Sequence, residues 1–299
     1  MIPYTLLSVT LLIALLSLSS LWSSVRRRDR HSGWLSVAMA VFIYLYGGWV
    51  FLSVWLKFVF LIVYVSIAIV AARSQTIPTT RSRKIVNVLF GLLFSILCVL
   101  YFTGTTGRPP GVANLALPFK TGSYYVFQGG NGLPTNLFHY HLRGAVFAID
   151  IVKLNRWGNR ANRIFSKNLN DYAIYNDTIY SPCSGFIAHT SDNNPDNIPP
   201  TLKRGPTNTN HVLIETDSMY VFLAHLRLHS VFVKAGQSVS TGQPLGLAGN
   251  SGFSIEPHLH IQAHQNTHTG LPWYREKQLQ LTFNGRKYLL FQMMDSAAQ

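Results

Sequence analysis

The chain has 299 residues, of which 48% are hydrophobic, and it carries 25 basic and 11 acidic side chains. Its two cysteines, Cys98 and Cys183, exclude a disulfide framework, because one lies in an apolar stretch and the other in the polar half of the chain. Residues 1–103 hold nine basic and one acidic side chain, which leaves 16 and 10 for residues 104–299. The excess of basic side chains in residues 104–299 suits binding to an anionic polymer or a membrane surface, and a role in general solubility explains it equally well. No nucleic-acid partner is expected.

The first third of the chain is nearly free of charge in four stretches that approach the ~20 residues needed to cross a bilayer. These stretches run from Thr5 to Trp22, from Trp34 to about Trp55, from Phe58 to Ala72 and from Ile85 to Phe102. They predict a four-helix transmembrane region over residues 1–103, with an uncertain boundary at Gly47-Gly48. A cleaved signal peptide is the rival interpretation of the first stretch, but its arginine cluster follows the apolar run instead of preceding it.

Basic residues predict the orientation of these helices. Four arginines follow the first stretch, and three arginines and a lysine separate the third from the fourth, whereas the second connection offers only Lys57. Loops rich in lysine and arginine stay in the cytoplasm. We therefore expect a multi-pass protein of the cytoplasmic (inner) membrane, with residues 104–299 on the periplasmic or cell-wall side. The default role of the helices is to anchor the chain in the lipid bilayer, with a membrane or envelope protein partner as an open possibility.

Beyond the membrane region the pattern changes to short apolar runs separated by turn residues. Residues 104–122, which begin with the glycine- and proline-rich GTTGRPPGV, are predicted to be a linker. Residues 123–299 follow as a mostly β domain, because runs such as YYVFQ (124–128), AVFAIDIV (145–152) and HLHIQA (258–263) are rich in β-branched and aromatic residues. Long polar loops are expected over residues 156–176 and 191–210, and loops of that length are often functional.

The stretch SGFSIEPHLHIQ (251–262) places His258 and His260 two residues apart on a predicted strand, so both side chains point to the same side. Alone, this pattern is weak, because the chain holds 11 histidines. Two other residues strengthen it. Asp150 interrupts the apolar run FAIDIV, and a buried carboxylate needs a partner such as a metal ion or a hydrogen-bonding loop. His225 stands similarly in FLAHL, and histidine and aspartate together suit zinc.

These motifs, in the order AIDI, SPCSGFI and YVFLAHLRLHSVFVKAGQSVSTGQPLGLAGNSGFSIEPHLHIQ, resemble the lysostaphin/LytM-type zinc metallopeptidases, which hydrolyse peptide bonds of peptidoglycan. The resemblance runs from about Asn136 to His264. It implies an antiparallel β-sheet domain with long loops, in which Asp150 and His260 bind Zn²⁺. It also implies that His225 and His258 orient and deprotonate the attacking water, or stabilise the developing oxyanion.

The family's first zinc ligand is usually a histidine four residues before the aspartate, and here that position is Val146. The upstream stretch NLFHYHLRG offers two replacements. We favour His141 slightly as the first ligand, with His139 as the alternative.

Two other functions stay open. A catalytically inactive module of the same fold could bind the cell wall or regulate a partner hydrolase, although Asp150, His225, His258 and His260 are all present. A biotinyl or lipoyl carrier domain would fit VKAGQSVSTGQPLG, but no lysine stands at the hairpin tip where such a carrier needs one. Cys183 lies where the family tolerates small residues, so we interpret it as a packed thiol and not as a nucleophile.

Overall fold

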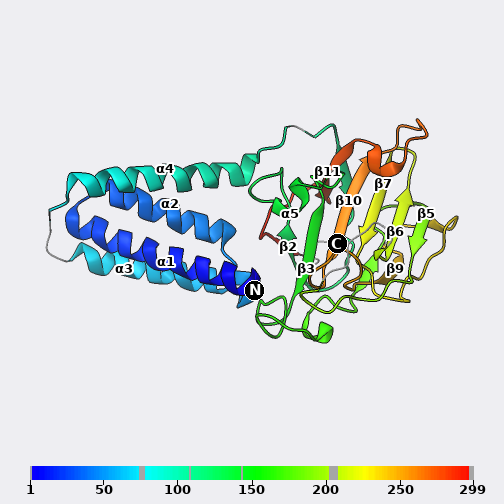
Figure 1. The fold of residues 1–299 in the computed structure, drawn as a ribbon, viewed down its shortest axis with the longest axis horizontal. Coiled ribbons are helices and arrows are strands. Elements are labelled where there is room, and N and C mark those ends of the chain that lie inside the picture. The colour runs from blue at the N-terminus through cyan, green and yellow to red at the C-terminus, as the bar shows by residue number, and fades with distance from the viewer. Residues whose placement is uncertain (1, 74–77, 108, 143, 202–207, 296–299) are drawn as a thin grey trace. The chain divides into compact units, whose positions relative to one another are not determined.

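A computed structural model describes residues 2–73, 78–107, 109–142, 144–201 and 208–295. The chain forms two compact units that meet in sequence between Thr103 and Gly104. The first unit is helical and the second is built on a β-sheet, as Figure 1 shows for each unit. Helix α4 ends at Thr103, and the next regular element in the described part of the chain is a strand.

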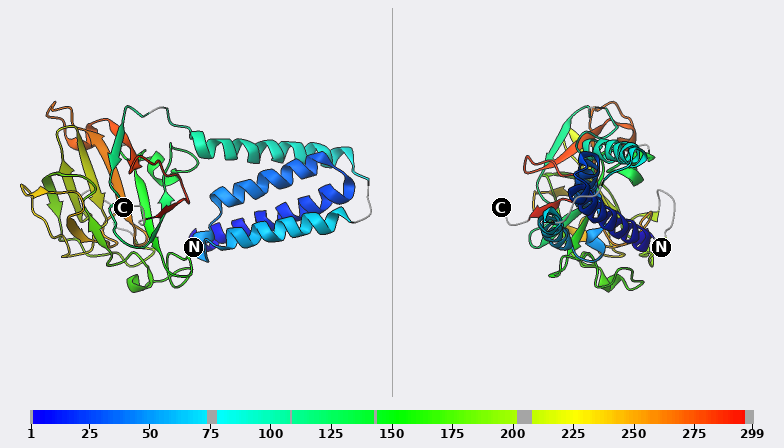
Figure 2. Two further views of the ribbon diagram at one scale, coloured as in Figure 1. Left: turned by 180° about the vertical axis from the view of Figure 1, so that it is seen from behind. Right: turned by 90° about the vertical axis from the view of Figure 1, so that its left-hand side faces the viewer.

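The N-terminal unit contains four long helices. They are α1 (Ile2–Arg27), α2 (Arg30–Tyr46), α3 (Leu56–Ala72) and α4 (Arg81–Thr103), with a 3-10 turn, η1 (Trp49–Phe51), after α2. Helix α2 packs against both α1 and α4, and α1 packs against α3 (Figures 1 and 2). Asp29 caps the start of α2 by accepting a hydrogen bond from the His31 backbone N–H at 3.1 Å.

The predicted second helix was too long. It was expected to reach about Trp55, whereas α2 ends at Tyr46. The reason lies at Gly47, whose extended backbone (ψ 136°) leaves the helix while its N–H still donates to Ile43 O. The Gly47-Gly48 pair therefore marks the end of α2.

Two of the four helices have the length and apolar character needed to cross a membrane, over Pro3–Arg27 and Arg81–Thr103. Helix α3 is apolar but has only 17 residues. Its outer face is apolar as well, since Ile62 is 68% exposed, and α4 exposes Leu89 to 61%. The count of four membrane spans thus stays a prediction, whereas two helices in the described part of the chain are long and apolar enough to cross a membrane.

The two basic connections lie at the same end of the helical unit. Arg27, at the end of α1, donates a hydrogen bond to the carbonyl of Pro78, just before α4. Arg83, in the first turn of α4, donates to Ser23 Oγ at 3.3 Å. The positive charges that predicted the orientation are therefore gathered on one side.

The C-terminal unit is a mostly antiparallel sheet in the order β12-β2-β3-β10-β7-β6-β5-β8, with β11 pairing with β10 and, in parallel, with β1. Strands β4 and β9 form a separate pair. The strands are β1 (Val112–Leu115), β2 (Ser123–Gln128), β3 (Ile149–Leu154), β4 (Thr178–Tyr180), β5 (Gly185–Ser191), β6 (His211–Glu215), β7 (Met219–Ala224), β8 (Ser238–Val239), β9 (Pro244–Leu247), β10 (Leu259–Gln265), β11 (Gln278–Phe283) and β12 (Met293–Asp295). The short helices are α5 (Leu137–Tyr140), η2 (Leu169–Asp171) and η4 (Trp273–Arg275).

Strand β10 is central, because it pairs with β3 on one side and with β7 on the other (Figure 1). Its odd-numbered residues Leu259, Ile261 and Ala263 are buried in the main apolar core, where Ile151 and Leu223 join them from the neighbouring strands. The side-chain alternation of a strand places the even-numbered residues of β10 on the opposite face. That face carries His260.

The predicted linker contains part of the sheet. Strand β1 lies within residues 104–122 and pairs with β11, whose alternation of Leu279, Leu281 and Phe283 with polar residues is a strand signal that the sequence analysis did not use. Residues 112–115 therefore belong to the β domain, and the connection from the helices is shorter than expected.

Candidate metal centre

The register between β3 and β10 sets the first contact of the site. Asp150 and His260 are directly opposed in this antiparallel pair. Both side chains are buried, and His260 Nδ1 lies 3.0 Å from Asp150 Oδ1. The carboxylate that interrupts the apolar run therefore faces an imidazole predicted to be a zinc ligand.

The one-turn helix α5 supplies the second imidazole. His139 is buried, and its Nε2 lies 3.3 Å from Asp150 Oδ1. His141, which the sequence analysis favoured, follows the helix and is exposed to solvent. Residues two apart on a helical turn point about 200° apart, so only one of the two histidines can face Asp150. The structure brings the alternative residue, His139, to the site.

Asn136 fixes the proton of His139. Its amide nitrogen donates to the carbonyls of Val146 and Ala148, at 2.9 and 3.0 Å, so its Oδ1 is the atom that faces His139 Nδ1 at 2.8 Å. That oxygen can only accept, so His139 Nδ1 carries the proton. The lone pair of Nε2 is left facing Asp150.

His258 stands on the other side of the same carboxylate oxygen. Its Nδ1 donates to the carbonyl of Glu256 at 2.8 Å, and its Nε2 lies 3.4 Å from Asp150 Oδ1. Burial alone would lower the pKa of His258, but the Asp150 carboxylate raises this pKa above its usual value. For Asp150, burial alone would raise the pKa, but His139 and His258 hold it well below the usual range.

His225 completes the group from the end of β7. Its Nδ1 donates to Ser251 O at 2.8 Å, and Gly249 N donates to His225 O at 3.0 Å, so the Gly-Asn-Ser-Gly turn holds both the ring and the backbone. These two hydrogen bonds hold the backbone of His225 at a positive φ of 65°, which is uncommon for a residue with a side chain. Burial and the nearby rings of His258 and His260 keep the pKa of His225 well below its usual value. The rings of His225 and His258 lie 4.7 Å apart.

The donor set fits a zinc ion. His139, Asp150 and His260 each offer one ligand atom, and these three atoms lie within 4.8 Å of one another. Two imidazole nitrogens with one carboxylate oxygen form a ligand set used by catalytic zinc. His139 and His258 donate their Nδ1 protons elsewhere, so each ring turns Nε2 toward the oxygen of Asp150, where it can hold a proton or leave its lone pair for a metal ion. A carboxylate surrounded by lone pairs needs protons or a metal cation for balance.

A buried ion pair supports the loop that carries His258. Arg160, which comes from the predicted long loop 156–176, donates to both carboxylate oxygens of Glu256 at 2.7 Å. Neither side chain is more than 9% exposed. Because Glu256 O also accepts the His258 proton, this pair fixes the backbone on which His258 is oriented. The supporting residues Asn136, Arg160 and Glu256 were not predicted, since nothing in their spacing along the chain links them to the histidines.

A row of rings extends from the cluster across the sheet. Phe222 on β7 lies 6.3 Å from His260 and stacks on Trp273 at 4.8 Å between ring centroids. His211 on β6 follows at 5.0 Å from Phe222, and His189 on β5 stacks on His211 at 5.0 Å. Phe222, His211 and Trp273 are half-buried and His189 is exposed, so the row offers an apolar surface beside the site.

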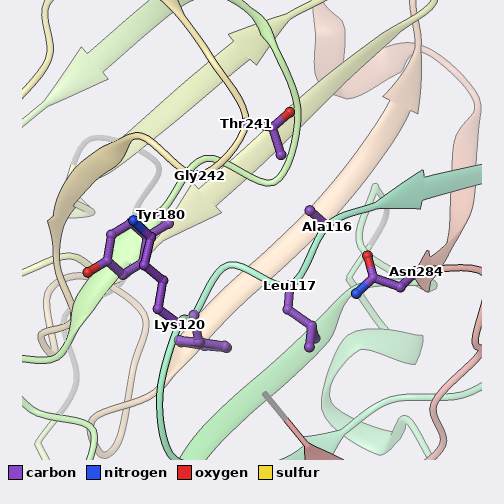
Figure 3. Close-up of a pocket in the computed structure, with 8 residues that line it drawn as sticks. Ala116, Leu117, Lys120, Tyr180, Thr241, Gly242 and Asn284 are labelled. Atoms are coloured by element: carbon purple, nitrogen blue, oxygen red, sulfur yellow. The ribbon is translucent and has the colours of Figure 1, made fainter. Parts of the chain in front are cut away.

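A pocket of about 420 Å³ lies elsewhere in the β domain. Figure 3 shows its lining, in which the Lys120 ammonium lies 4.5 Å above the ring of Tyr180. Its lining residues are Ala116, Leu117, Phe119, Lys120, Tyr180, Thr241, Gly242 and Asn284. None of them belongs to the histidine cluster, so this pocket is separate from the candidate metal centre.

Cys183 does not join the site either. It is half-buried and packs against the main apolar core. Burial raises its pKa to about 11, so the thiol stays protonated at neutral pH. A nucleophilic cysteine needs the opposite shift.

Residues 168–272 match the model of a protein family described as Peptidase family M23. The match includes His225, His258 and His260 and begins after His139 and Asp150. Over 90 residues the chain is 34% identical to the peptidoglycan DD-endopeptidase ShyA of Vibrio cholerae, covering 30% of this chain and 20% of that protein. Over 55 residues it is 42% identical to an uncharacterized metalloprotease of Haemophilus influenzae, covering 16% and 12%.

The chain therefore spans a fifth or less of the length of these two curated relatives. Among solved structures, it is similar to a zinc-containing peptidase from Vibrio cholerae, with 25% identity over 36% of this chain and 27% of that one. The TM-score of that match is 0.25, which is too low to add to the fold assignment. The family match supports an M23-type domain in the C-terminal unit, and it does not reach the helical unit, His139 or Asp150.

Proposed function

We propose that the chain is a membrane-anchored zinc endopeptidase that hydrolyses peptide bonds in peptidoglycan. The observation that carries this proposal is that His139, His258 and His260 converge on the carboxylate of Asp150. The Nδ1 atoms of His139 and His258 donate to acceptors outside this group, the Asn136 side chain and the Glu256 carbonyl. The resemblance of residues 168–272 to an M23 peptidase supports the same reaction class.

We assign His139, Asp150 and His260 as the residues that would hold zinc, because their donor atoms lie together. A bound zinc ion would supply Lewis-acid polarisation of the scissile carbonyl and lower the pKa of water, so the site needs no serine or cysteine nucleophile. Asp150 supplies the negative charge that favours a divalent cation at this position.

His258 and His225 would carry the proton transfers. Each ring donates its Nδ1 proton to a backbone carbonyl, so each Nε2 is free to accept a proton. We assign His258 Nε2 as the proton acceptor from the attacking water, because Asp150 raises its pKa. The same atom would return the proton to the leaving amine. His225, which stays neutral, would orient the water or the carbonyl oxygen.

The substrate assignment rests on similarity and on surface character. The relative named as a peptidoglycan endopeptidase shares 34% identity over 90 residues. The β domain and its tail hold 16 basic and 10 acidic residues, a balance that favours an anionic wall polymer. The row of Phe222, Trp273, His211 and His189 beside the cluster offers a half-exposed apolar track for a bound peptide.

The helical unit would hold the enzyme in the bilayer of the inner membrane. The apolar length of Pro3–Arg27 and Arg81–Thr103 supports at least two spans, and the exposed apolar face of α3 suits contact with lipid. The shared position of the two basic loops supports a cytoplasmic side at that end of the helices. The β domain would then act outside the cytoplasm.

Digestion of purified peptidoglycan by the full-length chain in detergent tests this proposal. We expect new amino groups to appear without new reducing sugar ends, because peptide bonds and not glycosidic bonds are cut. Chelation should stop the release and zinc should restore it, and Asp150→Asn should release nothing. His141→Ala is a matched control that should retain activity, because His141 is exposed and outside the cluster. A folded, zinc-loaded chain that releases no amines would instead favour a module that binds the wall or regulates a partner hydrolase.

A further inference from the structure

Two side chains on the site face of β10 have no role in the proposed mechanism. Gln262 and His264 continue the alternation of His258 and His260 along the same strand. Gln262 is 7% exposed and His264 is fully buried. Buried polar side chains are retained where their hydrogen bonds are met, so the partners of these two residues are informative.

Two backbone carbonyls fix the direction of their hydrogen bonds. A carbonyl oxygen can only accept. The Gln262 side chain places a terminal atom 3.0 Å from Gly144 O, so that atom is the amide nitrogen. His264 places Nδ1 2.9 Å from Glu276 O and Nε2 3.1 Å from Gly144 O, so both of its ring nitrogens face carbonyl oxygens.

The remaining contacts follow from these two. The Gln262 amide nitrogen, oriented by Gly144 O, also lies 3.0 Å from His264 Nε2. Its Oε1 then faces His260 Nε2 at 2.9 Å, so His260 Nε2 must be the donor. Every polar atom of Gln262 is thereby used. Both nitrogens of His260 thus face an oxygen, Nε2 that of Gln262 and Nδ1 that of Asp150 at 3.0 Å. A neutral ring that keeps its proton on Nε2 turns the lone pair of Nδ1 toward Asp150, where a metal cation can share it.

We propose that Gln262, held by Gly144 and His264, is a positioning residue that locks His260 in the tautomer with a proton on Nε2 and a free lone pair on Nδ1. The proposal rests on the proposed function in one respect, namely that the lone pair serves a metal ion. The partner of the outer nitrogen of a ligating histidine sets the tautomer and the basicity of the ring, and losing that partner typically costs 10–100-fold in metal affinity.

A purely structural role for Gln262 makes a different prediction. In that case its amide nitrogen matters because it ties the Gly144 backbone to β10, and its oxygen is incidental. Gln262→Met removes both functions. Gln262→Glu retains an oxygen for His260 Nε2 but offers no N–H to Gly144 O or His264, so the two variants separate the acceptor from the donor.

The first measurement uses the metal-free, full-length chain in detergent with ¹⁵N-labelled histidine, above neutral pH. The His260 signals are identified by their loss in His260→Asn. We expect a protonated Nε2 and an unprotonated Nδ1 in the wild type, and mixed tautomers in Gln262→Met. A wild-type His260 with its proton on Nδ1 would overturn the proposal, whether or not zinc binds.

The second measurement is the zinc dissociation constant, obtained by competition with a chelator. Gln262→Met should bind zinc about 10–100-fold more weakly, and Gln262→Glu should stay within about threefold of the wild type. Gln280→Met is a matched control, since Gln280 is a half-buried glutamine on β11 whose amide donates to Asn131 instead. Equal losses in both Gln262 variants, or none in either, would contradict the proposal. Absence of zinc binding in the wild type would instead contradict the proposed function, while the tautomer measurement would still stand.

Discussion

Two buried carboxylates of the β domain have opposite surroundings. Glu256 is matched by the guanidinium of Arg160, which donates to both of its oxygens at 2.7 Å. Among the described residues, Asp150 has three imidazoles as its ionisable neighbours, with His139, His258 and His260 within 3.4 Å of one oxygen. Arginine is always charged, whereas imidazole is charged only when protonated. The charge of Glu256 is therefore balanced within the chain, and that of Asp150 depends on protons or a bound cation.

This difference distinguishes a carboxylate that stabilises a loop from one that can bind a metal ion. A carboxylate with a permanent partner stabilises a loop, as Glu256 does for the backbone that orients His258. A carboxylate whose neighbours present lone pairs is suited to a divalent ion, and such sites perturb pKa values strongly. The predictions below test whether the two carboxylates behave in these two ways.

Asp150→Asn should have the largest effect on function. Zinc affinity and peptidoglycan hydrolysis should both fall by more than about 100-fold, the upper range for residues that only support a ligand. The metal-free variant should unfold at a lower urea concentration than the wild type at neutral pH, because the folded chain holds the pKa of Asp150 below its usual value and therefore gains stability from the charged carboxylate. A chelator titration and a urea titration followed by fluorescence measure the two effects. Retained zinc binding would contradict the assignment of Asp150.

His258→Ala should remove proton transfer while the metal ligands stay. We expect the hydrolysis rate to fall by about 10²–10⁴-fold, the usual contribution of a general acid-base residue. The zinc dissociation constant should change little, which kinetic and chelator measurements on one preparation can establish. His229→Ala is the control, because His229 is exposed and outside the cluster. A parallel loss of zinc would make His258 a ligand and not a proton carrier.

Arg160→Met should affect stability. Removing one partner of a buried ion pair typically costs about 3–5 kcal/mol, because it leaves the other charge buried alone. The same loss is expected for Glu256→Met, and the double variant should recover most of it. Urea titration of all three forms measures the coupling. A single-variant cost below about 1 kcal/mol would contradict the stabilising role assigned to the Arg160–Glu256 pair.

Cys183 should show the smallest effect, as a half-buried thiol whose pKa is raised by burial. With its pKa near 11, only about one molecule in a thousand carries a thiolate at a pH three units lower. Alkylation should therefore be slow in the folded chain, accelerate as pH rises, and accelerate again in urea, where the pKa returns toward its ordinary value. Cys183→Ala should hydrolyse peptidoglycan at the wild-type rate. Rapid alkylation at neutral pH would contradict the packed-thiol interpretation.

The sequence predicted the site residues that lie on strands better than those that lie in loops and short helices. Asp150 and His260 interrupt or alternate with apolar residues, and that pattern is enough to place them on strands. The central strands were found for the same reason. The edge strand β1 was taken as part of a linker, because its four residues carry too little pattern to reveal their pairing with β11.

The choice between His139 and His141 could not be made from sequence. On a strand both would have faced the same side, and on the helical turn of α5 only His139 does. The supporting contacts from Asn136, Arg160 and Gln262 depend on chain segments that meet only in the folded domain. Spacing along the chain carries no signal for such contacts.

Zinc content and affinity of the full-length chain, compared among wild type, His139→Ala and His141→Ala, test the central claim most directly. We expect about one zinc ion per chain in the wild type and in His141→Ala, with equal affinity, and a loss of more than about 100-fold in His139→Ala. Zinc that survives His139→Ala but is lost in His141→Ala would contradict the proposed metal centre. A folded wild-type chain that takes up no zinc would contradict the peptidase function itself.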